Sequence, residues 1–132
     1  MSVWGDFEVE SKIIDILRDT PHQEAHHFGR PYLSAYQLAI AVDRRWPGIR
    51  AALGNLPVGG LGTGMRSSLA QYLAGELSRR IKSGELTTVE GAFLTDEDLV
   101  EIVYAGSDGR RITSSLTGSG YDLSLFRLRS TS

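Results

Sequence analysis

The sequence predicts an α+β fold, with helices in the first two thirds of the chain and antiparallel strands after them. Up to Gly84, apolar residues recur at the spacing of amphipathic helices. After Gly84 the pattern changes to short runs of strand-forming residues separated by turns such as Asp108-Gly109, a pair typical of hairpins. A length of 132 residues fits one domain, and 41% hydrophobic residues supply a core without disulfides. We expect one domain with an acidic N-terminal helix and connector (1–29), a basic helical core (30–84) and antiparallel strands (85–132).

The N-terminal part predicts one helix followed by a connector. The helix covers "DFEVESKIIDILRDT" (6–20), whose isoleucines and leucine recur at helical spacing, and Pro21 helps to end it. The connector "HQEAHHFGRPYLS" (22–34) is polar and aromatic. Its last five residues either add a short strand or lead into a helix capped by Ser34.

Two further helices are predicted before the glycine-rich middle of the chain. The stretch "AYQLAIAVDRRW" (35–46) is apolar on nearly every side until Asp43, which implies deep burial. It stops before Pro47, because the residue preceding a proline avoids helical geometry. A short turn of helix over "GIRAAL" (48–53) ends at Gly54.

The best-defined helix covers "SSLAQYLAGELSRRIK" (67–82). Ser68 and Gln71 have the spacing of a capping box, and leucines at every fourth position form one apolar stripe. Arg80 projects into the apolar arc, so we expect its stem to pack and its guanidinium to reach solvent. The opposite side of this helix is small and basic, and its members are Gln71, Gly75, Ser78, Arg79 and Lys82.

Four strands are predicted after this helix. "TTVEGAFL" (87–94) and "DLVEIVYA" (98–105) come first, and the second is followed by the turn "GSDGRR" (106–111). "RITSSL" (111–116) then pairs back on the second strand, and "YDLSLFRLR" (121–129) is a last strand.

Positive charge is concentrated in the middle of the chain. The formal net charge is −2. Residues 1–29 carry two bases against six acids, residues 30–82 carry eight bases against two acids, and residues 83–132 carry four bases against eight acids. Seven of the eight central bases are arginines, which suit phosphate or carboxylate recognition. Either they form one basic surface, or they pair with the acidic flanks within the fold.

A glycine-rich loop precedes the helix of residues 67–82. Compared with nucleotide-binding motifs, "GGLGTGMRS" has Met65 where both patterns require glycine and Arg66 where the P-loop requires lysine. Backbone N–H groups at a helix start beside a base can still hold an anion, so Gly62, Gly64 and Arg66 form a candidate anion site. The alternative is a turn-forming loop whose glycines supply positive φ.

Neither a catalytic centre nor a metal site is predicted. The chain has no cysteine, and its three histidines (His22, His26, His27) fit a solvated connector or a pH-sensing interface better than a metal site. The acidic group Asp96–Asp98 is typical of a solvated turn, and no serine stands out as a nucleophile. We therefore expect no enzyme and no cofactor. The acidic N-terminus and the absence of a long apolar run predict a soluble, cytoplasmic protein without a membrane partner.

The predicted order of elements over about residues 9–112 resembles that of a winged helix-turn-helix domain. The resemblance implies a recognition helix over residues 67–82 and a wing at the turn 106–111 that contacts phosphate. The long loop 54–64 and the strands after Ile112 depart from this pattern. On this hypothesis the partner is double-stranded DNA, bound by Arg44, Arg45, Arg66, Gln71, Ser78, Arg79, Lys82, Arg110 and Arg111.

Two other functions remain open at this stage. The alternative is a protein-interaction or adaptor domain without catalysis, in which basic and acidic segments pair across a homodimer or with a partner protein. A net charge of −2 favours this alternative, since it is unusual for an isolated DNA-binding domain. The third is an enzyme that holds a phosphorylated ligand in the glycine-rich loop.

Overall fold

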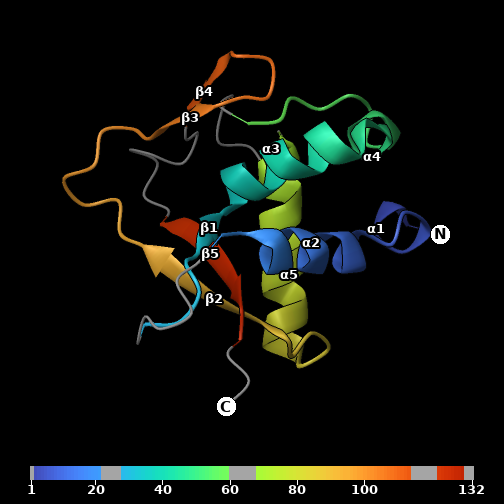
Figure 1. Ribbon diagram of the computed structural model, residues 1–132, viewed down its shortest axis with the longest axis horizontal. Coiled ribbons are helices and arrows are strands. Elements are labelled where there is room, and N and C mark those ends of the chain that lie inside the picture. Colours follow the sequence, from blue (N-terminus) through green and yellow to red (C-terminus); the bar gives the residue numbers. More distant parts are fainter. Residues whose placement is uncertain (1, 22–27, 60–67, 114–121, 130–132) are drawn as a thin grey trace.

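The computed structural model describes residues 2–21, 28–59, 68–113 and 122–129, and it confirms the α+β fold class (Figure 1). Helices occupy the first part of the chain, and antiparallel strands dominate the last part, as predicted. The helices are α1 (Val3–Asp6), α2 (Val9–Asp19), α3 (Ala35–Arg45), α4 (Pro47–Ala52) and α5 (Leu69–Ser83). The strands are β1 (Leu33–Ser34), β2 (Val89–Leu94), β3 (Val103–Ala105), β4 (Arg111–Thr113) and β5 (Leu123–Leu128).

The predicted helix of residues 6–20 corresponds to α2, and a separate short helix, α1, precedes it. Glu8 separates them in the left-handed region, with φ 49°, where few residues other than glycine are comfortable. The first helix begins earlier than predicted because the Ser2 hydroxyl caps it, accepting a hydrogen bond from the Gly5 N–H at 3.2 Å. The second buries its apolar stripe of Val9, Ile13, Ile16 and Leu17 in the core.

Both alternatives for residues 30–34 occur together. Leu33 and Ser34 form β1, and Ser34 also caps α3. A complete capping box lies here: the Gln37 N–H donates to the Ser34 hydroxyl at 3.2 Å, and the Ser34 N–H donates to Gln37 Oε1 at 2.7 Å. The deep burial expected for this helix is confirmed, since seven of its residues are buried, from Ala35 and Tyr36 to Val42.

The helices α4 and α5 begin and end close to the predicted residues. Pro47 occupies the first turn of α4, where a missing N–H costs nothing. Ser68 caps α5 by accepting from the Gln71 N–H at 3.2 Å, and Gly84 ends this helix with φ 82°. The predicted leucine stripe of α5 is fully buried.

The strands form two antiparallel sheets with an order that the sequence did not predict. One sheet has the order β1–β5–β2, so the strand that follows all the others lies in the middle. Its register pairs Leu33 with Phe126 on one side and Gly91 with Phe126 on the other. The second sheet is the predicted hairpin of β3 and β4, although β3 is shorter than the predicted strand of residues 98–105. Gly109, with φ 85°, makes the turn.

One core joins the helices to the three-stranded sheet. Helices α2 and α3 contact β5, and α5 contacts β2, so Phe126 and Val89 are buried among the helical leucines. The ion pair between Arg127 Nε and Glu90 Oε2, at 2.6 Å, joins β5 to β2 across the sheet. The hairpin of β3 and β4 lies apart from this sheet, near α3 and the connection that follows α4 (Figure 1).

Candidate functional site

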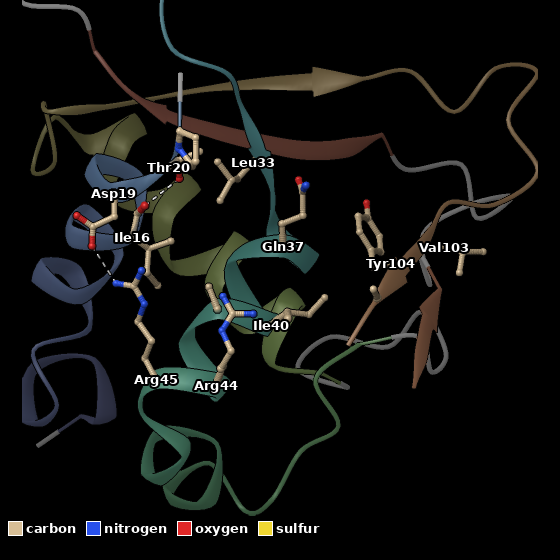
Figure 2. Close-up of a pocket in the computed structure, with 13 residues that line it drawn as sticks. Ile16, Asp19, Thr20, Leu33, Gln37, Ile40, Arg44, Arg45, Val103 and Tyr104 are labelled. Carbon is tan, nitrogen blue, oxygen red and sulfur yellow. Dashed lines mark hydrogen bonds and ion pairs between the residues drawn. The ribbon is translucent and has the colours of Figure 1, made fainter. Parts of the chain in front are cut away.

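A groove of about 510 Å³ lies between the ends of α2 and β1, one side of α3, and β3 (Figure 2). We call it the α3 groove. Helix α3 contributes polar and apolar side chains to it, whereas β3 contributes mainly apolar surface. Its lining comprises Ile16 and Asp19–Pro21 from α2 and its end, Leu33 from β1, Gln37, Ile40, Ala41, Arg44 and Arg45 from α3, and Val103–Ala105 from β3.

Helical periodicity explains which α3 side chains line the groove. Ile40, Ala41 and Arg44 follow Gln37 by three, four and seven residues, so all four lie on one side of the helix. The Ser34 capping box fixes Gln37 at one end of this row. Ile40 and Ala41 are buried beneath it, which gives the groove an apolar floor between two polar ends.

The two arginines at the end of α3 differ in their surroundings. Arg45 donates to Asp19 Oδ2 at 3.2 Å, and its guanidinium lies 5.9 Å from the centroid of the Trp46 ring. Arg44 is exposed and forms no ion pair with any residue that the structure describes. Figure 2 shows both side chains beside the groove, with Arg45 directed toward Asp19. The groove is therefore bordered by one cation that has no counterion among the described residues.

Tyr104 forms part of the opposite wall. Its ring stacks on Tyr36, with centroids 5.3 Å apart and planes 13° from parallel. Its hydroxyl oxygen is buried and has no hydrogen-bond partner among the described residues. Burial raises the pKa of this hydroxyl above its ordinary value of 10.0, the nearby Ser34 side chain lowers the pKa in part, and Tyr36 raises it further. The phenol therefore remains neutral to higher pH than an exposed one.

The edge of β3 beside the groove has unpaired backbone groups. The Gly106 N–H donates to the Arg110 carbonyl at 2.8 Å, which marks these two residues as a hydrogen-bonded pair. Such pairs alternate along an antiparallel ladder, so the N–H and C=O groups of Val103 and Ala105 point away from β4. No strand in the described parts of the chain pairs with this edge. Val103 and Ala105 both line the groove, and Val103 is 46% exposed.

Six of the candidate DNA-binding residues line three different grooves. Arg44 and Arg45 belong to the α3 groove. Ser78 and Lys82 line a groove of about 240 Å³ between α5 and the sheet, which we call the α5 groove. Arg110 and Arg111 line a third groove of about 350 Å³, between the hairpin and the connection after α4. Gln71 is half-buried in the first turn of α5, and Gly62, Gly64 and Arg66 lie outside the described residues.

Carboxylates of the same chain pair with most of the described central arginines. Arg79 pairs with Glu76, and Arg50 Nε lies 2.9 Å from Asp43 Oδ1. In the turn 106–111, Arg110 Nε lies 3.2 Å from Asp108 Oδ2. The acids of the first two pairs belong to the middle segment itself, so these pairs are local. Among the described central arginines, Arg45 with Asp19 and Arg80 with Glu85 form the pairs that reach the acidic flanks.

The expectation that the Arg80 guanidinium reaches solvent is wrong. The guanidinium lies 4.6 Å from the centroid of the buried Trp4 ring, and the side chain is only 16% exposed. Glu76 and Glu85 lie 3.3 and 3.5 Å from its nitrogens. The Arg80 guanidinium lies against α1 because Trp4 of that helix packs over it. The cation–π contact with Trp4 and the two carboxylates stabilise its charge there.

Several residues of the α3 groove were not predicted from the sequence. Gln37 and Ile40 share the helical spacing of Arg44, so the pattern around Arg44 contained a signal for them. Asp19 and Tyr104 had no such signal, because their positions depend on contacts between distant parts of the chain.

Within the described residues, no group of three or more histidines, cysteines, aspartates or glutamates is arranged to hold a metal ion. His22, His26 and His27 lie outside these residues, as does the glycine-rich loop from residue 60 to residue 67. In the same described parts, no helix has both the length and the apolar character needed to cross a membrane.

No protein-family model, curated protein or solved structure matches this chain. The functional proposal therefore depends on the geometry of the chain itself.

Proposed function

We propose that this chain is a protein-interaction domain that binds an extended, acidic segment of a partner protein in the α3 groove. The observation that carries the proposal is the state of Arg44, which lies beside the groove without an ion pair to any described residue. By contrast, Arg45, Arg50, Arg79 and Arg80 pair with carboxylates of the same chain. A free guanidinium beside an apolar floor attracts a carboxylate that is flanked by apolar side chains.

The edge of β3 favours an extended partner. Its outward N–H and C=O groups at Val103 and Ala105 can add a strand by main-chain hydrogen bonding, while pockets beside the edge select side chains. The volume of about 510 Å³ is within the usual range of binding pockets, and it suits a short stretch of peptide. Partner side chains that face α3 would contact Ile40 and Ala41 and end near Arg44.

A library of short peptides with one acidic residue between apolar residues tests this proposal. Peptides selected on the intact chain are expected to shift the amide NMR signals of Val103 and Ala105. Replacing Arg44 with glutamate should weaken their binding at least tenfold, since it turns one charge-assisted contact into a repulsion. Lys82→Glu is the matched control, because Lys82 lies in the α5 groove. Equal losses in the two variants, or no selected peptide at all, would contradict the proposal.

Binding of double-stranded DNA is the second candidate. It is favoured by the winged-helix-like order of helices around the sheet β1–β5–β2 and by the exposed side of α5, which carries Ser78, Arg79 and Lys82. Two observations weigh against it. Glu76 pairs with Arg79, and the turn after β2 carries the acidic group Asp96–Asp98, which repels phosphate.

Fluorescence anisotropy with a labelled random-sequence duplex at low salt tests the second candidate. If DNA is the ligand, affinity should fall steeply with salt, and Lys82→Ala should lower the salt slope by about one unit. Arg44→Ala serves as the control from another groove. A flat titration at low salt would eliminate this candidate and leave the peptide-binding proposal intact.

A further inference from the structure

The strand β2 forms an unpaired edge of the three-stranded sheet. The Arg129 N–H donates to the Thr88 carbonyl at 2.9 Å, which sets the alternation of the ladder between β2 and β5. By this alternation the N–H and C=O groups of Val89, Gly91 and Phe93 point away from β5. Within the described residues no strand pairs with this side of β2.

Within the described residues, this edge lacks most of the features that usually prevent strand pairing, and its charged residue, Glu90, pairs with Arg127 of β5. No proline or lysine occurs between Val89 and Leu94, and the strand is six residues long. Two large apolar side chains lie exposed at its end, with Phe93 70% and Leu94 40% accessible. A regular strand of this length with exposed apolar residues is suited to pairing with another chain.

Gly91 and Phe93 lie on the same side of β2, two residues apart. Both line the α5 groove together with Ser78, Ile81 and Lys82. Phe93 therefore has no large neighbour on its own strand, and Gly91 presents no side chain beyond the backbone. On the β5 side, the Phe126 ring lies 3.6 Å from where a Cβ of Gly91 would stand, so the exposed surface of Gly91 is on the unpaired side of β2. An aromatic side chain placed across from a strand glycine covers such a surface.

We infer that a second copy of this chain pairs with β2 through its own β2, antiparallel and around a two-fold axis at Ala92. In this register Phe93 of each copy lies opposite Gly91 of the other, so each aromatic ring covers the other copy's glycine. The two three-stranded sheets then form one sheet of six strands. The contact is self-complementary, as a two-fold interface requires.

Charge complementarity favours a second copy over an unrelated partner. The pairing places the turn Asp96–Asp98 of one copy beside Leu86–Thr88 of the other, just after the end of α5. None of these carboxylates forms an ion pair with a described residue, and neither does Lys82 in the α5 groove. Each copy thus brings an acidic turn toward Lys82 of the other copy, which has no ion pair among the described residues, and the two-fold axis makes this contact twice.

Sedimentation velocity over a range of protein concentrations tests the inference. The intact chain is expected to shift from monomer to dimer as concentration rises. Phe93→Lys should shift the transition at least tenfold toward higher concentration, because it places a charge at the edge. Val103→Lys is the control, since Val103 is an exposed apolar residue on β3 instead. A monomer at every concentration would overturn the inference.

A cysteine cross-link tests the register. The chain has no cysteine, so Ala92→Cys introduces a single thiol. In the inferred register residue 92 lies opposite itself as a non-hydrogen-bonded pair, with a Cα separation of about 4.5 Å that permits a disulfide. Mild oxidation should give a covalent dimer in high yield with Ala92→Cys and little with the control Val100→Cys, which is 87% exposed in the wild type. Equal yields would overturn the register. The α3 groove is a separate surface, so neither result depends on peptide binding there.

Discussion

Helices α3 and α5 both end near two adjacent arginines, yet the two pairs have different surroundings. At the end of α5, Arg79 and Arg80 both pair with Glu76, and Arg80 also packs on Trp4. At the end of α3, Arg45 pairs with Asp19, and Arg44 forms no ion pair with the described residues. Described carboxylates thus pair with both arginines of α5 but only with Arg45 of α3.

The position of the nearest carboxylate explains the difference. Glu76 precedes Arg80 by four residues, so the helix itself brings the two together. Asp43 adjoins Arg44 in sequence, but its Oδ1 pairs with Nε of Arg50 in α4 at 2.9 Å. Whether an arginine of this chain has an ion pair therefore depends on which nearby carboxylates already pair with other bases. A count of charges in the sequence does not show this.

The largest effect is expected at Arg80, the more buried of the two arginines of α5. Arg80→Ala removes the contact with Trp4 and one partner of the partly buried Glu76. We expect a loss of about 2–3 kcal/mol in the free energy of unfolding, because the packed stem and the contact with Trp4 are lost and Glu76 keeps only the exposed Arg79 as a counterion. Urea denaturation measures it. Arg79→Ala is the control, expected to cost less than about 0.5 kcal/mol since Arg79 is 65% exposed. Similar losses would mean that the two arginines of α5 are equivalent.

The outer side of α5 should tolerate an added side chain. A Cβ at Gly75 meets no atom within 4 Å, and the residue lies inside a helix. Gly75→Ala should therefore raise the free energy of unfolding by about 0.5–1 kcal/mol, because alanine restricts the unfolded chain and favours helix. Thermal unfolding measures the gain, and a decrease would indicate that this side of the helix is covered.

The wall of the α3 groove should make stability depend on pH through Tyr104. Its pKa in the folded chain is raised by burial above the ordinary 10.0, so the neutral phenol favours the folded state. This contribution is fully present below pH 10 and is lost as the pH rises through the raised pKa. Tyr104→Phe should abolish this part of the alkaline decline, and at neutral pH it should be neutral or stabilising by up to about 1 kcal/mol, since the buried hydroxyl has no described partner. Parallel unfolding curves at pH 7 and pH 11 would show it; an unchanged alkaline decline would contradict it.

The smallest stability effects are expected at the end of α3. Arg45→Ala should cost about 0.5 kcal/mol, because its partner Asp19 is 57% exposed and an exposed pair contributes little. Arg44→Ala should change the free energy of unfolding by less than that, since no described ion pair is lost. A destabilisation by Arg44→Ala larger than that by Arg45→Ala would show that Arg44 is structurally engaged.

Local signals predicted the helices well. Ser34 and Ser68 as caps, the stop before Pro47 and the glycine end at Gly84 all follow from neighbouring residues. The β3–β4 hairpin was likewise predicted from its Asp-Gly turn. The break at Glu8 was missed because a left-handed glutamate has no sequence signal.

Long-range pairing was beyond the sequence. Nothing in residues 121–129 indicates that they form the middle of a sheet, with Leu33 on one side and Gly91 on the other. The candidate site suffered from the same limitation, because the basic segment is divided among grooves whose other walls come from β3, from the sheet and from the hairpin. Helical spacing could indicate one wall of a groove and never the opposite one.

The central place of β5 has a consequence for biosynthesis. Strands β1 and β2 are translated well before it, and neither gains its hydrogen-bonding neighbour until residues 123–128 have left the ribosome tunnel. Leu33 pairs with Phe126, so most of the chain is synthesised between the two partners. Loss of these six residues by premature termination or proteolysis would leave two solitary strands and an uncovered helical core, a species prone to aggregation.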